Sequence, residues 1–388
     1  MTYQPEVEPK FGRRKFLRIA LGLGIGTAFA IYFGQNLFTS QAKKASESIP
    51  KPIESKSSLQ PPSARLNEYA KNIMPGGPPK DGIPPIDNPQ YISRDAADSL
   101  LSNNDVIFGL EYNGAVIAYP QIVLVWHEIV NDVIGGERIS ITYCPLTGSA
   151  VGFKGKSRVD GKELTFGTSG NLVNSNLLMY DRQTDGNWPQ ILGMAINGPS
   201  KGNVLLQVPL DWTTWERWKT KHPDTKVLST NTGYVRSYGS DPYGSYRQQR
   251  GYYFEEYVLF PVMATDTRFH PKKVVVGVNS GDSYLAVLKD EFRAKKIENI
   301  IVGSEPVVLL YEEELDVVRA YSRRIDAETL EFSMEGGKIV DRQTSSEWSP
   351  NGISTGGRLG NSRLKHVNYF DALWFAWYAF YPQTQVYL

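Results

Sequence analysis

Three residues in the first half of this 388-residue chain could do chemistry together: Cys144, His127 and Glu128. Cys144 is the only cysteine, so no disulfide can form within the chain. A thiolate and a neutral imidazole together bind copper or zinc, and a carboxylate can complete such a site or orient the imidazole ring. The same three groups could instead act as nucleophile, base and orienting acid.

The first of the segments that must position these residues is predicted to be a helix over residues 120–136. It is apolar apart from His127, Glu128, Asn131 and Asp132, with a proline at its start and Gly-Gly at its end, which are typical helix boundaries. In a helix, His127 and Asn131 share one face, and Glu128 and Asp132 share the neighbouring face. Buried carboxylates are costly unless they are paired or bind a metal, which favours a functional role for this segment.

Two further segments complete the candidate site. Residues 139–143 alternate as in a strand, and the following Cys-Pro pair places the Cys144 thiol at the strand end. A polar, glycine-containing loop is expected over residues 167–176, where hydroxyl and amide groups could line the site. The candidate catalytic residues are Cys144, His127, Glu128 and Asp132; the candidate metal ligands are Cys144, His127 and Glu128; and the candidate site-lining residues are Ser169, Asn174 and Asn176.

Much of the sequence occurs twice. A shift of 168 residues pairs residues 106–109 (VIFG) with 274–277 (VVVG), and matches continue in the same order. After one deletion, a DRQT-x3-W motif at 181–188 recurs at 341–348. We expect the aspartate of this motif to cap a turn and its tryptophan to fill the core. The matches predict two tandem copies of one mixed strand and helix unit, packed with pseudo-twofold symmetry.

The two predicted copies differ at the candidate site. Lysines stand at the positions that correspond to His127 and Glu128, and Glu312 stands at the position of Cys144. Most of the polar loop at 167–176 is missing from the second copy. Because the reactive groups occur only in the first copy, we interpret them as functional and the second copy as degenerate.

Composition favours a β-rich α+β fold, since 24 prolines and 35 glycines are typical of many turns between strands. Lys and Arg number 42 and Asp and Glu 41, a balance that gives no reason to expect nucleic acid as a partner. The domain prediction has four parts: a twin-arginine-like signal or membrane anchor at 1–38, a disordered linker at 39–66, the first repeat with the candidate site at 67–250, and the second, degenerate repeat at 251–388.

The amino terminus resembles a twin-arginine export signal. Arg13 and Arg14 precede an apolar run over residues 19–34, and the basic flank is expected to stay cytoplasmic. Cleavage after Ala42 and retention as a membrane anchor are both compatible with this pattern. The sequence therefore predicts an extracytoplasmic protein, with the membrane as a partner if the segment is retained.

The chain resembles an uncharacterised prokaryotic family that is catalogued as domain of unknown function 3179. The resemblance covers roughly residues 70–388 and rests on four motifs: GGPPKDGIP at 76–84, HEIVND at 127–132, TYCPL at 142–146 and DRQT-x3-W at 181–188. Asn187 departs from the family pattern, in which a serine is expected before the tryptophan. The resemblance implies no established activity, so the chemistry must be argued from the residues.

Three hypotheses about function follow. The first is a copper or zinc site at Cys144 and His127, completed by Glu128, Asp132 or a methionine. The second is a thiol-dependent enzyme that uses Cys144 and His127, and the sequence does not decide whether the protein is an enzyme. The third is a non-catalytic binding module with a tyrosine-rich surface for sugar or peptide at 233–246, a stretch that could equally be an ordered linker between the copies.

Overall fold

The computed structural model describes residues 60–158 and 161–387. The predicted signal at 1–38 and most of the predicted linker lie outside these ranges. The last residues of that linker are helical, in η3 (Pro62–Arg65) and the start of α3 (Leu66–Lys71). Among the described residues, no helix combines the length and apolar character needed to cross a membrane.

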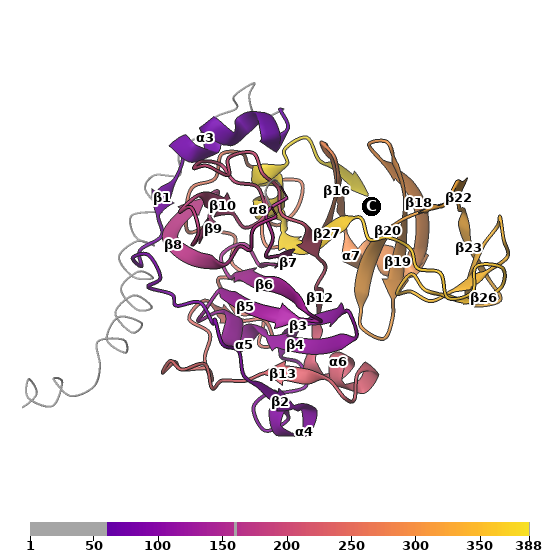
Figure 1. The fold of residues 1–388 in the computed structure, drawn as a ribbon, viewed down its shortest axis with the longest axis horizontal. Coiled ribbons are helices and arrows are strands. Elements are labelled where there is room, and N and C mark those ends of the chain that lie inside the picture. Colours follow the sequence, from indigo (N-terminus) through magenta and orange to yellow (C-terminus); the bar gives the residue numbers. More distant parts are fainter. Residues whose placement is uncertain (1–59, 159–160, 388) are drawn as a thin grey trace, which may run out of the picture. The chain divides into compact units, whose positions relative to one another are not determined.

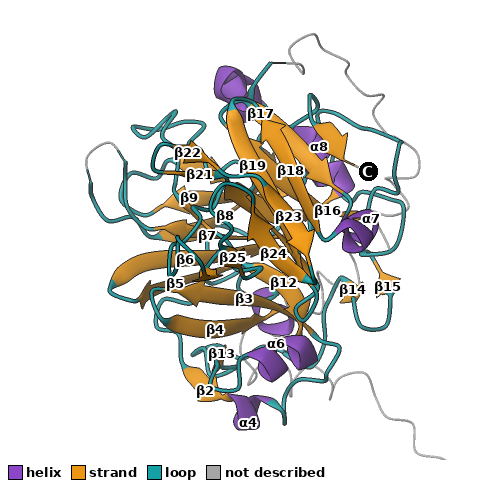
Figure 2. Cartoon of the chain, turned by 90° about the vertical axis from the view of Figure 1, so that its right-hand side faces the viewer, coloured by secondary structure: helices purple, strands orange, loops and turns teal. Residues whose placement is uncertain are grey.

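Strands dominate the described chain, and its α-helices span seven residues or fewer (Figure 2). The predicted β-rich α+β class is therefore confirmed. Apart from residues 233–237, the described residues belong to one unit. Large aromatic side chains are prominent in its core, including the fully buried Trp188, Trp218 and Trp377.

The first segment, residues 74–228, builds three sheets with the strand orders β1-β8-β9-β10, β11-β7-β6-β5 and β12-β3-β4-β13-β2 (Figure 1). Neighbouring strands in these sheets are antiparallel except β4 and β13. Its elements are β1 (Met74–Pro75), β2 (Tyr91–Ser93), α4 (Arg94–Ala97), β3 (Val106–Tyr112), β4 (Ala115–Pro120), α5 (Gln121–Leu124), β5 (Ile129–Ile134), β6 (Glu137–Cys144), β7 (Ser149–Lys154), β8 (Phe166–Val173), β9 (Asn176–Asp181), β10 (Asn187–Pro189), β11 (Gln207–Val208), β12 (Asp211–Thr214), α6 (Trp215–Lys221) and β13 (Lys226–Leu228).

A short hairpin of β14 (Gly244–Ser245) and β15 (Arg250–Gly251) precedes the second segment, residues 274–387. The second segment has sheets of order β27-β16-β17-β28, β18-β19-β20, β21-β22 and β23-β24-β25-β26. Its elements are β16 (Val274–Ser280), β17 (Ser283–Val287), α7 (Lys289–Lys295), β18 (Ile297–Val302), β19 (Glu305–Glu312), β20 (Val317–Ser322), β21 (Arg324–Ile325), β22 (Glu328–Thr329), β23 (Phe332–Glu335), β24 (Lys338–Asp341), β25 (Glu347–Trp348), β26 (Ser354–Gly356), β27 (Asn368–Leu373), α8 (Trp374–Phe380) and β28 (Gln385–Tyr387).

The strands of the two segments correspond at the shift found in the sequence. Moved by 168 residues, β3, β5, β6 and β7 coincide at both ends with β16, β18, β19 and β20. Both segments also contain one parallel pair, β4 with β13 and β17 with β28. Trp218 covers Gly109 as Trp377 covers Gly277, so closely that a Cβ atom there would lie 2.1 Å and 2.0 Å from the two indole rings.

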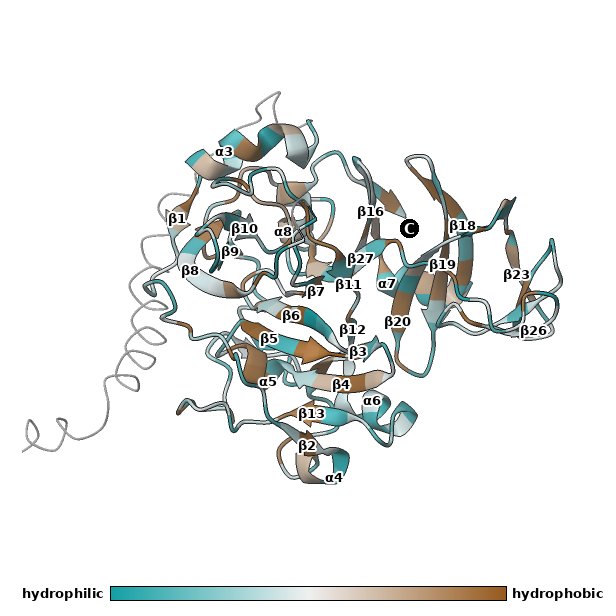
Figure 3. Cartoon of the chain, in the orientation of Figure 1, coloured by the Kyte–Doolittle hydropathy of each residue, from teal (hydrophilic) through white to brown (hydrophobic). Residues whose placement is uncertain are grey.

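The helix predicted over residues 120–136 is wrong. Within this range only α5 is helical, and β5 follows it. The two ends of β5 are apolar and its middle is hydrophilic (Figure 3). Gly135 and Gly136 have φ angles of 57° and 81° and form the turn of the β5–β6 hairpin rather than a helix end. The β-branched residues of β5 favour a strand, and an apolar run alone does not distinguish a buried helix from a buried strand.

The polar loop predicted over residues 167–176 is also wrong, since most of it is β8. Asn174 and Ser175, with φ angles of 52° and 61°, form the turn of a hairpin between β8 and β9. The hairpin of β23 and β24 in the second segment is shorter, in line with the deletion predicted there from the sequence. Alternating residues in β8 point to opposite faces, so its polar side chains cannot all line one site.

The structural role predicted for the DRQT-x3-W motif is confirmed. Asp181 accepts hydrogen bonds from the Thr184 amide at 2.6 Å, the Thr184 hydroxyl at 2.8 Å and the Trp188 indole at 2.9 Å. Asp341 accepts the three equivalent bonds in the second segment. The motif therefore holds a turn against the core in both segments.

Candidate functional site

Cys144 is positioned by two strands of the first segment. It is the last residue of β6, where Pro145 ends the strand ladder, and its thiol is 1% exposed. The Leu177 amide, in β9, donates a hydrogen bond to Sγ over 3.3 Å. Sγ in turn donates to the Ser175 carbonyl, in the β8–β9 turn, over 4.0 Å. The buried Ser175 hydroxyl has no hydrogen-bond partner among the described atoms. The thiol thus lies between two sheets, in a largely apolar core cluster and next to these polar groups.

Glu128 occupies the turn between α5 and β5. Its backbone is left-handed, with φ of 59°, and its carbonyl accepts the Tyr143 amide at 2.8 Å. Lys296 has the same conformation, with φ of 61°, and accepts the Tyr311 amide at 2.8 Å. Since both segments share this backbone turn, the turn belongs to the fold, and only the side chain distinguishes the first segment.

Glu128 is largely buried, and its carboxyl group has no partner among the described residues. The residue is 7% exposed, and within residues 60–158 and 161–387 no hydrogen bond or ion pair reaches its carboxyl oxygens. Burial raises the pKa of this carboxyl from 4.5 to about 8. A carboxyl group with this pKa is mostly protonated at pH 7.

Glu128 lies close enough to Cys144 to act electrostatically on the thiol. Burial raises the pKa of the Cys144 thiol to about 11, and the charge of Glu128 adds to this effect. The Tyr243 phenol responds to both groups, since burial and then the charges of Glu128 and Cys144 raise its pKa. The structure therefore brings together two of the residues that the sequence singled out, and it adds a tyrosine.

The tyrosines come from the residues before the second segment, and no pattern in the sequence indicated that they lie near Cys144. Tyr252 donates its hydroxyl to the Leu146 carbonyl at 2.8 Å, and its amide to the Tyr243 carbonyl at 2.7 Å. Lys272 lies 3.4 Å from the centre of the Tyr252 ring and donates to the Tyr252 carbonyl at 2.9 Å. The tyrosine-rich composition of 238–253 was the available signal, but it did not reveal what the segment packs against.

A network of buried hydrogen bonds lies next to the thiol. The Asn176 amide donates to the Thr147 hydroxyl and to the Gln190 side chain, both at 3.0 Å. Ser149 bonds Thr147 at 2.9 Å and Gln190 at 2.7 Å. The Thr147 hydroxyl also acts on the Cys144 thiol, lowering its pKa slightly against the larger effect of burial. Asn176 thus lies one side chain away from the thiol, in a network whose groups are already satisfied.

His127 does not join Glu128 and Cys144. Its Nδ1 is 2.8 Å from the Pro84 carbonyl, and its Nε2 is 2.8 Å from the Tyr238 hydroxyl. Since a carbonyl can only accept, Nδ1 carries the proton in the neutral ring and Nε2 accepts from Tyr238. Both ring nitrogens therefore bond groups other than the thiol, and His127 connects the backbone at Pro84 to Tyr238 of the tyrosine-rich segment.

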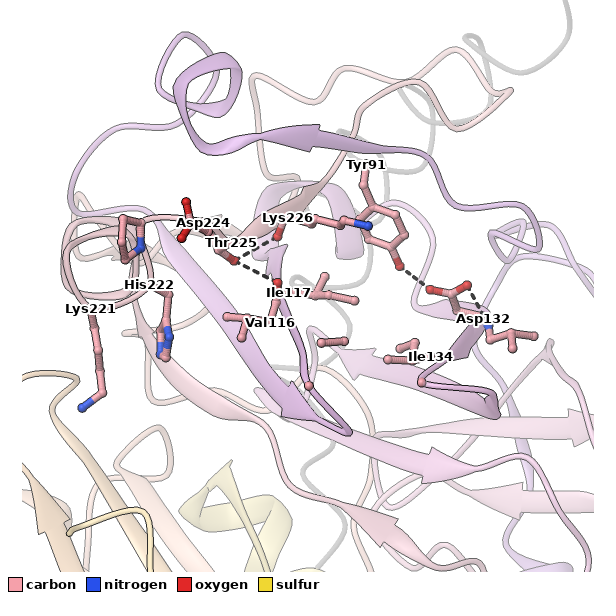
Figure 4. A pocket seen from close by; sticks show the side chains of 15 residues that line it. Tyr91, Val116, Ile117, Asp132, Ile134, Lys221, His222, Asp224, Thr225 and Lys226 are labelled. Atoms are coloured by element: carbon pink, nitrogen blue, oxygen red, sulfur yellow. Dashed lines mark hydrogen bonds between the residues drawn. The ribbon is translucent and has the colours of Figure 1, made fainter. Parts of the chain in front are cut away.

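Asp132 lies in a different place, a surface cleft (Figure 4). Its carboxylate accepts from the Tyr91 hydroxyl at 2.5 Å and from the Val133 amide at 2.7 Å. It faces away from Asn131, the next residue in β5, whose side-chain amide donates to the Phe166 carbonyl at 2.9 Å. The strand alternation that replaced the predicted helix is the reason why Asp132 is separated from the thiol.

Ser169 and Asn174 also lie outside the candidate site. Ser169 donates its hydroxyl to the Leu178 carbonyl at the irregular part of the β8–β9 ladder. Asn174 donates to the Ala379 carbonyl at 3.1 Å and accepts the Met263 amide at 2.7 Å. Both side chains hold backbone segments in place. In the described part of the chain, no group of three or more His, Cys, Asp or Glu side chains could hold a metal ion.

Comparison with known proteins identifies a family without assigning an activity. The profile of one family, described as "Protein of unknown function (DUF3179)", matches residues 80–384. The chain belongs to this family. No curated protein and no solved structure matches the chain. The predicted resemblance is therefore confirmed, and the function must be argued from the site.

Proposed function

We propose that the protein is an extracytoplasmic metal-binding protein, which takes up one zinc or copper ion between Cys144 and Glu128. The observation that carries this proposal is the buried Glu128 carboxyl group beside the Cys144 thiol, with no partner of its own. The extracytoplasmic location rests on the arginine pair and apolar run of the amino terminus.

An acid that is removed from water without a partner costs several kcal/mol when it ionises, so proteins retain one where it has a use. Asp371, which is buried in β27, also accepts no hydrogen bond, and burial raises its pKa to about 7, although the Lys289 ammonium partly offsets this effect. No such cation acts on Glu128. A bound metal ion would supply the missing positive charge.

The chemistry of the two groups selects the kind of ion. A thiolate prefers soft or borderline metals, and zinc accepts a thiolate together with a carboxylate. A metal ion would displace the protons of Cys144 and Glu128, so binding should release protons. The Tyr243 phenol and the Ser175 hydroxyl are the neighbouring oxygen groups that could complete the coordination. His127 has no place in this revised ligand set.

Thiol catalysis is less well supported. Burial raises the pKa of Cys144 to about 11, so the nucleophilic thiolate is scarce at neutral pH. His127 would have to act as the base, and its ring nitrogens are bonded to Pro84 and Tyr238. We therefore favour binding over catalysis.

We infer that the two segments are two copies of one unit related by a pseudo-twofold axis, and that the second copy lost the metal site. The shared strand bounds and the shared left-handed turn at Glu128 and Lys296 support this inference.

Metal titration of the purified, reduced chain tests the proposal. The wild type should keep close to one equivalent of zinc or copper(I) after dialysis, and calorimetry in buffers of different ionisation enthalpy should show release of about two protons at pH 7. Cys144→Ser and Glu128→Gln should each abolish retention, whereas Asp132→Asn, in the surface cleft, should leave it unchanged. Wild-type protein that emerges metal-free, or retention by Cys144→Ser, would overturn the proposal.

A further inference from the structure

The surface cleft that contains Asp132 has a volume of about 550 Å³, which is in the range of small-molecule sites. It lies between the start of β4, the β5–β6 turn and the end of α6. In Figure 4, Tyr91 and Asp132 lie on one side of the cleft and His222 and Asp224 lie on the other. Val116 and Ile117 lie between them.

The second segment fills the equivalent space. The positions that correspond to Val116 and His222 hold Tyr284 and Tyr381, whose rings stack with centres 4.4 Å apart. These two tyrosines are 8% and 3% exposed. The surrounding framework is the same, since His222 packs on Trp218 at 4.2 Å and Tyr381 packs on Trp377 at 4.4 Å. Smaller side chains on a shared framework therefore leave the first segment open.

The walls of the cleft combine polar edges with an apolar floor. Asp132 accepts two hydrogen bonds, which leaves lone pairs on its oxygens for a ligand. The Tyr91 hydroxyl lies between Asp132 and Tyr119, at 2.5 Å and 3.3 Å, so the ring is held in place. Val116 and Ile117 supply the floor. Asp132, Asp224 and Lys226 line the cleft, whereas the ammonium of Lys221 pairs with Glu312 and Glu314.

A ligand with hydroxyl groups around its rim and an apolar C–H face matches these walls. We propose that the cleft binds a neutral sugar ring of an oligosaccharide, with its C–H face on Val116 and its hydroxyl groups toward Asp132. Anionic ligands are disfavoured because Asp132 and Asp224 outnumber Lys226 at the cleft. This site is separate from the proposed metal site, and neither needs the other.

Binding of neutral oligosaccharides of glucose, mannose, galactose and N-acetylglucosamine, first on an array and then by calorimetry, tests this proposal. The variant Val116→Tyr/His222→Tyr, which copies the filled state of the second segment, should weaken binding at least tenfold. Asp132→Asn should weaken it by a smaller factor. Leu206→Tyr, which adds a tyrosine at an exposed position outside the cleft, should bind as the wild type does.

Metal-free Cys144→Ser should also bind sugar as well as the wild type, which separates this proposal from the metal site. Circular dichroism and thermal unfolding would establish that the filled variant is folded. The proposal is overturned if no oligosaccharide of the panel binds at millimolar concentration, or if the filled and wild-type proteins bind equally. Binding of extended peptides in place of sugars, abolished by the filled variant, would overturn the ligand assignment.

Discussion

The same backbone turn holds Glu128 in the first segment and Lys296 in the second, but the two side chains differ in burial and in pairing. Lys296 is exposed and pairs with Glu313 at 2.8 Å, whereas Glu128 is buried with no partner. The residues that end β6 and β19 also differ between the two segments. Cys144 is a buried neutral thiol, and its counterpart Glu312 is a buried acid bonded to Arg319 at 2.9 Å.

The contrast separates what the fold requires from what a site requires. In the second segment, the buried Glu312 is neutralised by Arg319 and by Lys221, which lies 2.6 Å away. Arg319 also bonds Asp211 of the first segment. These charges hold elements together, so they have a structural reason to be buried. The unpaired acid of the first segment has no such reason, which is why we assign it to a ligand.

The largest effect is expected from removing the cation that joins the buried acids of the two segments. Arg319→Met removes the partner of Asp211 and one of the two cations that neutralise Glu312, and it should lower the free energy of unfolding by about 3 to 5 kcal/mol, mainly because Asp211 is left buried and unpaired. Denaturant unfolding at pH 7 measures this. Adding Asp211→Leu and Glu312→Leu to the variant should recover much of the loss. A loss below about 1 kcal/mol in the single variant would contradict the assigned structural role.

A somewhat smaller effect is expected at Glu128. Its pKa is 4.5 before burial and about 8 in the folded protein, so the folded state binds more protons between these pH values. The free energy of unfolding of metal-free wild type should therefore fall as pH rises from 4.5 to 8. Glu128→Gln cannot ionise and should be more stable than wild type by about 3 kcal/mol at pH 7, with little difference at pH 4.

Urea unfolding of both metal-free proteins across this pH range measures the effect. Lys296→Gln, at the equivalent exposed position, should follow the wild-type pH profile. If the wild type and Glu128→Gln lose stability in parallel, then Glu128 is ionised and paired in solution, and the contrast between the segments disappears.

The smallest of these effects is expected at the packing of a glycine against a tryptophan, which both segments share. Gly109→Ala and Gly277→Ala would each force a Cβ into a tryptophan ring, at 2.1 Å and 2.0 Å. Each change should cost about 2 kcal/mol, because overpacking of a buried site forces its neighbours to move. Thermal unfolding of the two variants should give similar shifts in Tm, and a large difference would show that the two frameworks are not equivalent.

Local patterns in the sequence predicted several features correctly. The DRQT-x3-W turns are held by bonds between residues at most seven positions apart, so the motif contains nearly all of its own interactions. The Cys-Pro pair at 144 and 145 placed the thiol at a strand end, because proline stops a strand ladder wherever the strand lies. The β-rich class followed from composition.

By itself, the sequence determined which residue types differ between the two segments, and that Glu128 and Cys144 belong to the altered set. Only the tertiary structure decided that residues 129–134 form a strand, because pairing with β6 outweighs a pattern that fits a helix equally well. It also directed Asp132 and His127 away from the thiol and brought Tyr243 toward it. Such contacts join residues far apart in the chain, and their energies depend on burial, which no local pattern specifies.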